Sequence, residues 1–371
     1  MTTLRVIVDD VLAPTPNGQS RYAEELTRAL IATAPRGASV EGVVSASPEA
    51  EYEDLLDRLH GMSLYKSSLA RRELAAAWQH GFTRLPGLVH APSLLAPLFK
   101  HDRLHTSGYQ AIVTLHDVSP WLHPESVVGR SAGWHVAMAQ RAHRYADALV
   151  VPSHAVANQL AEHLDFGDRV RVIGGAPSTT LAVPANADTR AERLGLPQNY
   201  VVAVGDASPR RGLDRLIAAL ARPETLDLDL VLVGTGSVAA RDAALAAGIP
   251  ERRVHALGAI ADADYATVLD RATALVLPSR LEGFGLTMLE AFQFGTPVVH
   301  SDDPALLELG GDAGVVIEDG DDFVESLATA LVRVAEDREH ATSLATAGLD
   351  RAGLFTWESS AEKVWQLHAE L

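Results

Sequence analysis

Residues 275–299 read LVLPSRLEGFGLTMLEAFQFGTPVV, and this stretch decides the fold. Its apolar start predicts a short buried strand over residues 274–277, which Pro278 ends. Residues 286–292 then have helical spacing, and Gly295 and Pro297 stop that helix. A second strand begins at Val298. Strand, glycine loop, helix and strand in succession are typical of a parallel α/β sheet.

The loop of this unit, Glu282–Gly285, has the features of a ligand site. It follows a strand and precedes a helix, where backbone N–H groups favour an anion such as phosphate. Two glycines let the backbone approach a ligand closely. Glu282 and Glu290 flank the helix start. The spacings Ser279 to Glu282 and Thr287 to Glu290 also match capping boxes, in which the glutamates would only satisfy a helix end.

Composition bounds the class of protein. A chain of 371 residues with 47% hydrophobic and 21% charged residues indicates two folded domains. The absence of cysteine excludes disulfides and thiolate metal sites, and it fits a reducing cytoplasm. No apolar run is long enough for a membrane-spanning helix, and the N-terminus enters a strand-like run, unlike a signal peptide.

Charge is distributed unevenly along the chain. The formal net charge of −17 argues against a general nucleic-acid binder. Residues 1–183 hold 16 basic and 18 acidic residues, whereas residues 184–371 hold 15 and 30. The nearly neutral first half also holds 11 of the 15 histidines, so it tolerates an anionic partner better than the second half.

Strands alternate with helices in both halves, which predicts two parallel, doubly wound sheets. Residues 174–198 lose this periodicity and contain the expected linker. In residues 49–82 we expect only helices. The expected strands are 4–8, 40–44, 88–90, 111–115, 148–151 and 170–173 in the first half, and 200–204, 228–233, 253–256, 274–277, 297–299 and 315–317 in the second.

Four motifs in order resemble those of the retaining glycosyltransferases of family 4, which have the GT-B fold. Residues 278–298 resemble the Glu-x7-Glu signature. Residues 204–216, VGDASPRRGLDRL, resemble the stretch that carries Pro-Arg-Lys in the family. Residues 114–125, TLHDVSPWLHPE, resemble the His-Asp loop of mannosyltransferase-like members, and residues 17–22, NGQSRY, resemble the first glycine loop.

The resemblance implies two Rossmann-like domains that face each other across a cleft. Residues 1–183 would form the acceptor-side domain and residues 184–355 the nucleotide-sugar domain. Residues 356–371 would form a C-terminal helix that packs back on the first domain. The implied reaction transfers a sugar, with mannose favoured, from a nucleotide diphosphate to a hydroxyl of a glycan or glycolipid.

The resemblance also assigns roles to residues. His116, Glu282 and Arg211 are the expected catalytic residues: His116 contacts the transferred sugar, Glu282 accepts from a sugar hydroxyl, and Arg211 binds phosphate. Glu290 is expected on the ribose hydroxyls. No general base is assigned, because the leaving phosphate is thought to take the acceptor proton. The expected donor-binding residues are Gly18, Arg210, Arg211, Ile260, Glu282, Gly283, Phe284, Gly285, Leu286 and Glu290.

Three positions depart from the family pattern: Ser20, Asp206 and Gly212. They motivate an alternative function, a catalytically weak nucleotide-sugar-binding subunit of a polysaccharide synthase complex. A relative that uses phosphate or a small sugar as acceptor is a further alternative. A dinucleotide-dependent oxidoreductase is disfavoured, because the turn Gly234-Thr-Gly236 lacks the third glycine of the fingerprint at Ala239.

No metal or other cofactor is expected, since GDP-mannose or a UDP-sugar would serve as substrate. The expected partners are this donor and a glycan or lipid-linked acceptor, with no nucleic acid. The basic segment Lys66–Phe82 has two interpretations: an interfacial helix for peripheral membrane association of the N-terminal domain, or an ordinary amphipathic surface helix. We expect a cytoplasmic protein, at the inner face of the membrane if the acceptor is lipid-linked.

Overall fold

The computed structural model describes residues 2–13, 17–102, 108–127 and 132–371. The chain divides into two compact units: unit 1 comprises Met1–Gly175 and Thr356–Leu371, and unit 2 comprises Ala176–Phe355. The sequence places the boundary after residue 183, whereas the structure places it after Gly175. The reason is that Leu181 packs in the core of unit 2, and its carbonyl accepts a hydrogen bond from Gln293 Nε2 at 3.0 Å.

Unit 1 is built on a seven-stranded sheet in the order β3-β2-β1-β4-β5-β6-β7, and each recorded strand pair is parallel. The central strands are apolar and buried, as expected for a parallel sheet with helices on both faces. The strands are β1 Thr2–Ile7, β2 Ala38–Ala46, β3 Ser63–Ala70, β4 Gly87–Ala91, β5 Tyr109–Thr114, β6 Ala148–Val151 and β7 Val170–Val172.

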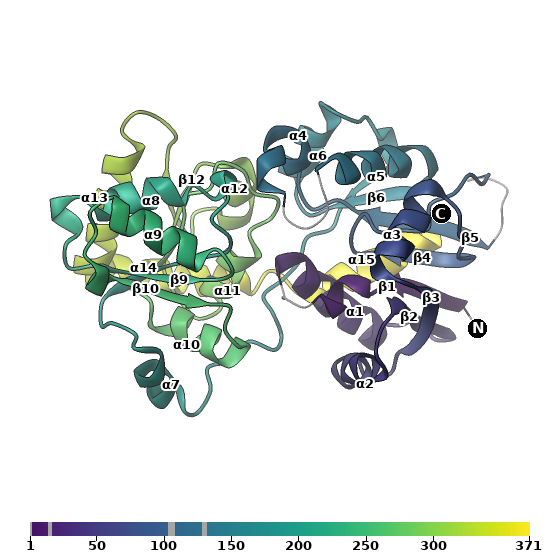
Figure 1. Ribbon diagram of the computed structural model, residues 1–371, viewed down its shortest axis with the longest axis horizontal. Coiled ribbons are helices and arrows are strands. Elements are labelled where there is room, and N and C mark those ends of the chain that lie inside the picture. Colours follow the sequence, from purple (N-terminus) through teal and green to yellow (C-terminus); the bar gives the residue numbers. More distant parts are fainter. Residues whose placement is uncertain (1, 14–16, 103–107, 128–131) are drawn as a thin grey trace. The chain divides into compact units, whose positions relative to one another are not determined.

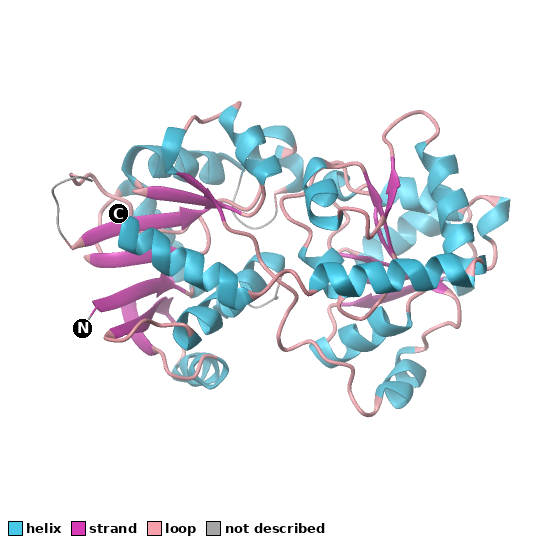
Figure 2. Cartoon of the chain, turned by 180° about the vertical axis from the view of Figure 1, so that it is seen from behind, coloured by secondary structure: helices cyan, strands magenta, loops and turns pink. Residues whose placement is uncertain are grey.

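The helices of unit 1 cover this sheet and include the last helix of the chain (Figures 1 and 2). That helix, α15, is fastened by Ser360 Oγ, which donates to the Gly174 carbonyl at 2.8 Å, and by Trp365 Nε1, which donates to the Leu30 carbonyl at 3.3 Å. The α-helices of unit 1 are α1 Gly18–Ala32, α2 Glu49–Arg58, α3 Arg71–His80, α4 Ser119–Leu122, α5 Ala132–Tyr145, α6 His154–Ala161 and α15 Trp357–Glu370.

The expectation of helices throughout residues 49–82 was wrong at β3. Ser63–Ala70 forms an edge strand that pairs with β2 and is largely solvent-exposed. Its polar residues lack the apolar alternation that marks a half-buried strand, so the pattern resembled a surface helix. The segment Lys66–Phe82 is therefore not one interfacial helix, and Trp78 is buried in unit 1 instead of facing outward.

Unit 2 repeats the architecture with a six-stranded parallel sheet in the order β10-β9-β8-β11-β12-β13. The strands are β8 Tyr200–Val204, β9 Asp229–Val233, β10 Val254–Gly258, β11 Ala274–Leu277, β12 Val298–Ser301 and β13 Val315–Ile317. The helices are α7 Ala187–Leu194, α8 Leu213–Leu220, α9 Ser237–Ala246, α10 Asp262–Arg271, α11 Leu286–Phe292, α12 Pro304–Gly310, α13 Phe323–Glu336 and α14 Arg338–Ala352.

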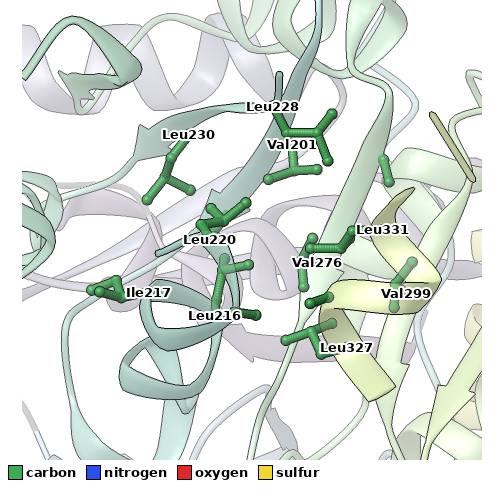
Figure 3. Packing of buried hydrophobic residues seen from close by; sticks show 14 of the residues in the cluster. Val201, Leu216, Ile217, Leu220, Leu228, Leu230, Val276, Val299, Leu327 and Leu331 are labelled. Carbon is green, nitrogen blue, oxygen red and sulfur yellow. The ribbon is translucent and has the colours of Figure 1, made fainter. Parts of the chain in front are cut away.

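Apolar clusters lie on both faces of the unit 2 sheet. On one face, side chains of α8 and α13 pack on the strands, for example Leu216 and Leu331 against Val201 and Val276 (Figure 3). The other cluster joins α10, α11 and α12 to the opposite face. Full burial of such a side chain contributes roughly 2 kcal/mol. The two parallel, doubly wound sheets predicted from the sequence are thereby confirmed, and the loops at their carboxyl ends are held on rigid cores.

Candidate active site

Three loops at the carboxyl end of the unit 2 sheet pack against each other through glycines. Gly205, after β8, and Gly234, after β9, have φ angles of 129° and 118°, which only glycine adopts readily. A Cβ on Gly234 would lie 2.4 Å from the Gly205 carbonyl oxygen, and one on Gly212 would lie 1.9 Å from the Pro278 carbonyl oxygen. The close approach at Gly234 thus joins the loops after β8 and β9, and the close approach at Gly212 joins the segment after β8 to the loop after β11.

Glu282 lies in the loop after β11 and is 5% exposed. Its Oε1 accepts hydrogen bonds from Ser279 Oγ at 2.8 Å and from Arg211 Nη1. Arg210 Nη1 lies 4.0 Å from its Oε2. The structure therefore brings together three of the predicted site residues, and it pairs Arg211 with Glu282, a contact that the sequence did not predict.

Arg210 also connects two of the loops. Its backbone carbonyl accepts from the Arg280 amide at 2.7 Å, and its Nη1 donates to the Leu281 carbonyl at 3.4 Å. Its Nε is buried and makes no hydrogen bond within the described parts of the chain. A buried guanidinium nitrogen without an acceptor is costly, so this side chain has capacity for an anionic ligand.

The predicted glycine loop precedes α11. Gly285 has a φ of 96° and is the N-cap of α11, with no side-chain cap. The capping-box alternative for Thr287 and Glu290 was wrong, because Glu290 lies inside the helix. Instead, the buried Glu290 Oε2 accepts a hydrogen bond from Tyr265 Oη at 2.9 Å. Phe284 and Ile260 are half-buried and pack against the same core cluster as Tyr265.

The sequence analysis missed Asp303 near this site and named Asp206 only as a departure from the family pattern. Asp303 follows β12, and its Oδ2 accepts from the Glu282 amide at 3.1 Å. Burial and the charge of Glu282 raise the pKa of Asp303 to about 6. Asp206 accepts from the Ser208 amide at 2.9 Å, and although burial alone would raise its pKa, that hydrogen bonding and the two arginines lower it. The sequence feature that could have identified Asp303 is its position directly before Pro304, because an Asp followed by a Pro is common at the start of a helix.

In unit 1, His116 lies two residues after the end of β5, and two neighbours hold its side chain. Its Nε2 donates to the Pro92 carbonyl at 2.7 Å, and its ring meets Tyr22 edge-on with centroids 4.9 Å apart. Burial lowers its pKa, although that hydrogen bond and the charges of Asp117 and Asp10 oppose the effect. His116 is therefore a neutral imidazole whose Nδ1 is the acceptor nitrogen, suited to a hydroxyl donor.

Gly18 is the first residue of α1, and its Cα faces open space, since an added Cβ would meet nothing within 4 Å. Asn17 Oδ1 accepts from the Gln19 and Ser20 amides at 2.9 and 3.0 Å, and Ser20 Oγ accepts from the Asn17 amide at 2.7 Å. Ser20 thus completes a capping box, which explains its departure from the family glycine. Part of the preceding loop, residues 14–16, lies outside the described residues.

A second cluster in unit 1 was also missed. Asp10 follows β1, and its two oxygens accept from Arg71 Nη2 at 2.7 Å and Ser93 Oγ at 2.6 Å. Asp9 is buried and accepts from the Ser45 amide at 2.9 Å. Adjacent acids directly after a buried strand were the available sequence signal. They organise the same end of the sheet as His116, whose pKa responds to the charge of Asp10.

Nowhere in the described ranges do three or more His, Asp or Glu side chains gather as a metal would require. Among the helices of those ranges, none has the length and apolarity to cross a bilayer.

Both units match sequence models of glycosyltransferase families. The sequence model for "Glycosyltransferase Family 4" matches residues 16–176, and that for "Glycosyl transferases group 1" matches residues 185–351. The chain is 30% identical over 167 residues to O-antigen chain mannosyltransferase B of Escherichia coli, covering 44% of this chain and 43% of that protein. It is 27% identical over 398 residues to MMP alpha-(1->4)-mannosyltransferase of Mycolicibacterium hassiacum, covering 93% and 92%.

The chain spans 43% of the length of that Escherichia coli protein, 56% of D-inositol 3-phosphate glycosyltransferase of Corynebacterium diphtheriae and 33% of D-rhamnosyltransferase WbpZ of Pseudomonas aeruginosa. Among solved structures, Anabaena HepE in complex with UDP and glucose matches with a TM-score of 0.73 at 19% identity, covering 100% of both chains. At that identity the match concerns the fold. The predicted GT-B fold is confirmed.

Proposed function

Because this chain belongs to the group 1 and family 4 glycosyltransferases, we propose that it moves a sugar from a nucleotide-diphosphate sugar to a hydroxyl of a glycan or glycolipid, with retention at the anomeric carbon. The observation that carries the proposal is the group of Glu282, Arg210 and Arg211 at the carboxyl end of the unit 2 sheet. It combines cationic groups for a diphosphate with an acceptor-only side chain for a sugar hydroxyl.

The residues would act as follows. The bond between the anomeric carbon and the diphosphate breaks, and negative charge grows on the departing oxygen. Arg210 and Arg211 stabilise that charge as fixed cations, so the proposal needs no metal. Glu282 accepts from a hydroxyl of the transferred sugar, and the new bond forms to the acceptor oxygen. The acceptor proton passes to the leaving diphosphate.

Further residues of each unit have proposed contacts with the donor. Glu290 would accept from the ribose hydroxyls, with its carboxylate oriented by Tyr265. The neutral His116 of unit 1 would accept from the sugar through Nδ1. The loop Gly283–Leu286 would supply backbone N–H groups, Ile260 would flank the base, and Gly18 would leave room for the phosphates.

We propose mannose as the transferred sugar and GDP-mannose or a UDP-sugar as the donor. Two relatives named as mannosyltransferases support the sugar, and the neighbour solved with UDP and glucose supports a nucleotide-linked donor. The acceptor would be a glycan or a lipid-linked saccharide, and the reaction would take place in the cytoplasm, at the membrane for a lipid-linked acceptor.

The alternative of a catalytically weak nucleotide-sugar-binding subunit rested on three departures from the family pattern, and each has a local explanation. Ser20 completes a capping box, and Asp206 holds a turn with Ser208. Gly212 has a φ of 64° and touches the Pro278 carbonyl, so a side chain there would displace the site loop. These residues build the site, and they give no reason to prefer a subunit without activity.

The first test is a thermal-shift comparison of GDP, UDP, ADP and dTDP with the purified protein. We expect one nucleoside diphosphate to raise Tm by several degrees, because a ligand at about a hundred times its Kd adds about 2.7 kcal/mol to the free energy of unfolding. The matching nucleoside without phosphates is the control and should shift Tm much less. Failure of every nucleotide to shift Tm, together with no consumption of any nucleotide-sugar, would overturn the proposal.

Tyr265→Phe tests the ribose contact. The variant keeps the ring in the core and removes only the hydroxyl that orients Glu290, so KM for the donor should rise about 5- to 20-fold, with kcat little changed. Tyr200→Phe is a matched control, because Tyr200 Oη donates to the Val268 carbonyl at 2.7 Å in the same unit. Equal donor KM in both variants would contradict the role of Glu290.

A further inference from the structure

Asp303 links the helix after β12 to the loop that carries Glu282. It is 6% exposed and is the N-cap of α12. Its Oδ1 accepts from the amides of Ala305 at 2.9 Å and Leu306 at 3.4 Å, whereas its Oδ2 accepts from the Glu282 amide at 3.1 Å. One oxygen therefore caps a helix, and the other holds the backbone of the residue proposed to bind the donor sugar.

Two buried carboxylates consequently lie close together, and their surroundings are defined. Glu282 faces Asp303 from the loop after β11, and Arg210 and Arg211 pair with Glu282 from the segment after β8. On β12, the buried His300 donates its Nδ1 to the Ser301 carbonyl at 2.7 Å and stays neutral, because burial lowers its pKa. Asp302 accepts from the Asp319 amide at 3.1 Å.

We propose that Asp303 is a positioning residue for Glu282: it fixes the Glu282 amide, and its own buried charge directs the Glu282 carboxylate toward Arg211 and Ser279. This inference rests on the proposed function, in which Glu282 binds the donor sugar. Repulsion between the two acids favours the arrangement in which the guanidinium and the Ser279 hydroxyl both contact Oε1.

The arrangement has a consequence for donor binding. Glu282, Asp303 and Asp206 carry three negative charges near the two positive charges of Arg210 and Arg211. The diphosphate of a donor adds two more negative charges, so it binds better when Asp303 is protonated. The pKa of Asp303 is about 6. Donor affinity should therefore rise as pH falls through this value, with uptake of a proton on binding.

Two variants test the second oxygen and the charge of Asp303. Asp303→Ser keeps a helix cap but has no second oxygen for the Glu282 amide. Asp303→Asn keeps the size and the cap, but it removes the charge and puts an NH2 group in place of the oxygen that accepts from the Glu282 amide. We expect kcat to fall at least tenfold in both at pH 7.5, where Asp303 of the wild type is charged. The increase in donor affinity between pH 7.5 and 5.5 should be present in the wild type and absent in both variants.

Asp337→Ser is the matched control. Asp337 caps α14 in the same unit by accepting from the His340 amide at 3.0 Å, far in sequence from the Glu282 loop. It should keep wild-type kcat, KM and pH profile. If Asp303→Ser and Asp303→Asn behave like this control, the inference is overturned. If the serine variant does not fold, the asparagine variant decides.

A second measurement is independent of activity. Because the pKa of Asp303 is higher in the folded than in the unfolded chain, its contribution to stability is present at low pH and is lost as pH rises from about 4 to about 6. The Tm of the wild type relative to Asp303→Asn should thus be highest near pH 4 and decline toward pH 7. A constant difference would overturn the inference. A wild-type protein that transfers sugar from no nucleotide donor would refute the proposed function instead, while this comparison would still report on Asp303.

Discussion

Replacing Glu282 with alanine is expected to lower kcat for sugar transfer by at least a hundredfold while leaving the protein folded. The carboxylate is the acceptor proposed for a hydroxyl of the sugar that develops charge in the transition state, and loss of such a group typically costs about 10²–10³ in rate. The fold should survive, because Asp303 still holds the backbone of residue 282 and the loop glycines are unchanged.

The same variant should bind the nucleoside diphosphate more tightly. In the structure Arg211 Nη1 contacts Glu282 Oε1, and Arg210 Nη1 lies 4.0 Å from Oε2. Removing the carboxylate leaves these guanidiniums with one negative partner fewer, so the diphosphate gains attraction. We therefore expect stronger product inhibition together with the lower kcat, a combination that simple misfolding does not produce.

Arg211 variants should give the complementary result. Arg211→Ala removes a cation from the leaving diphosphate and leaves Glu282 buried without its closest cation, so both kcat and Tm should fall. Arg211→Lys keeps the charge and should retain more activity. Glu318→Ala, at an exposed position of unit 2, is the control and should behave as wild type. Full activity in Glu282→Ala or Arg211→Ala would refute the assigned roles.

The parts of the site that could be predicted were those with a short-range pattern. The loop Glu282–Gly285 follows an apolar strand and precedes a helical run, so its place at a carboxyl end followed from the alternation of elements. The position of His116 at a carboxyl end was predicted in the same way, because it follows the apolar run 111–115. Ser63–Ala70 could not be predicted, because an exposed edge strand of a parallel sheet has no apolar face of its own.

Contacts between distant residues could not be read from local spacing. The pairs Arg211–Glu282, Glu282–Asp303 and Tyr265–Glu290 join residues 71, 21 and 25 positions apart. The first two pairs connect separate strand-to-helix segments, and the third connects α10 to α11. Spacing instead suggested a capping box from Thr287 to Glu290, which was wrong because α11 begins at Leu286 and Glu290 lies inside it. The residue types indicated which side chains belong to the site, but only the packed structure showed which of them contact each other.

A pair of buried histidines predicts that the protein is unstable in acid. His90 on β4 is 0% exposed, and neither ring nitrogen has a hydrogen-bond partner among the described residues. His368 on α15 lies with its ring centroid 5.8 Å away, and its Nδ1 pairs with Gln110 Oε1 at 3.0 Å. These residues join the C-terminal helix to the centre of the unit 1 sheet.

Burial lowers the pKa of His90 to about 3, and burial and the neighbouring His90 lower the pKa of His368 well below its usual value. The unfolded chain binds these protons near the ordinary pKa of about 6.5, whereas the folded chain does not. Their contribution to stability is therefore complete above about pH 6.5 and is lost as pH falls toward 3. At about 1.4 kcal/mol per pH unit, His90 alone costs about 2 kcal/mol by pH 5, and His368 acts in the same direction.

His90→Phe should remove part of this acid sensitivity, because the new side chain is apolar, similar in shape and unable to take a proton. Between pH 7.5 and 4.5, the Tm of the variant should fall less steeply than that of the wild type, even if its Tm at pH 7.5 is lower from imperfect packing. His60→Phe, at an exposed site on unit 1, should keep the wild-type slope. If His90→Phe and the wild type have parallel pH profiles, protonation of His90 does not drive acid unfolding.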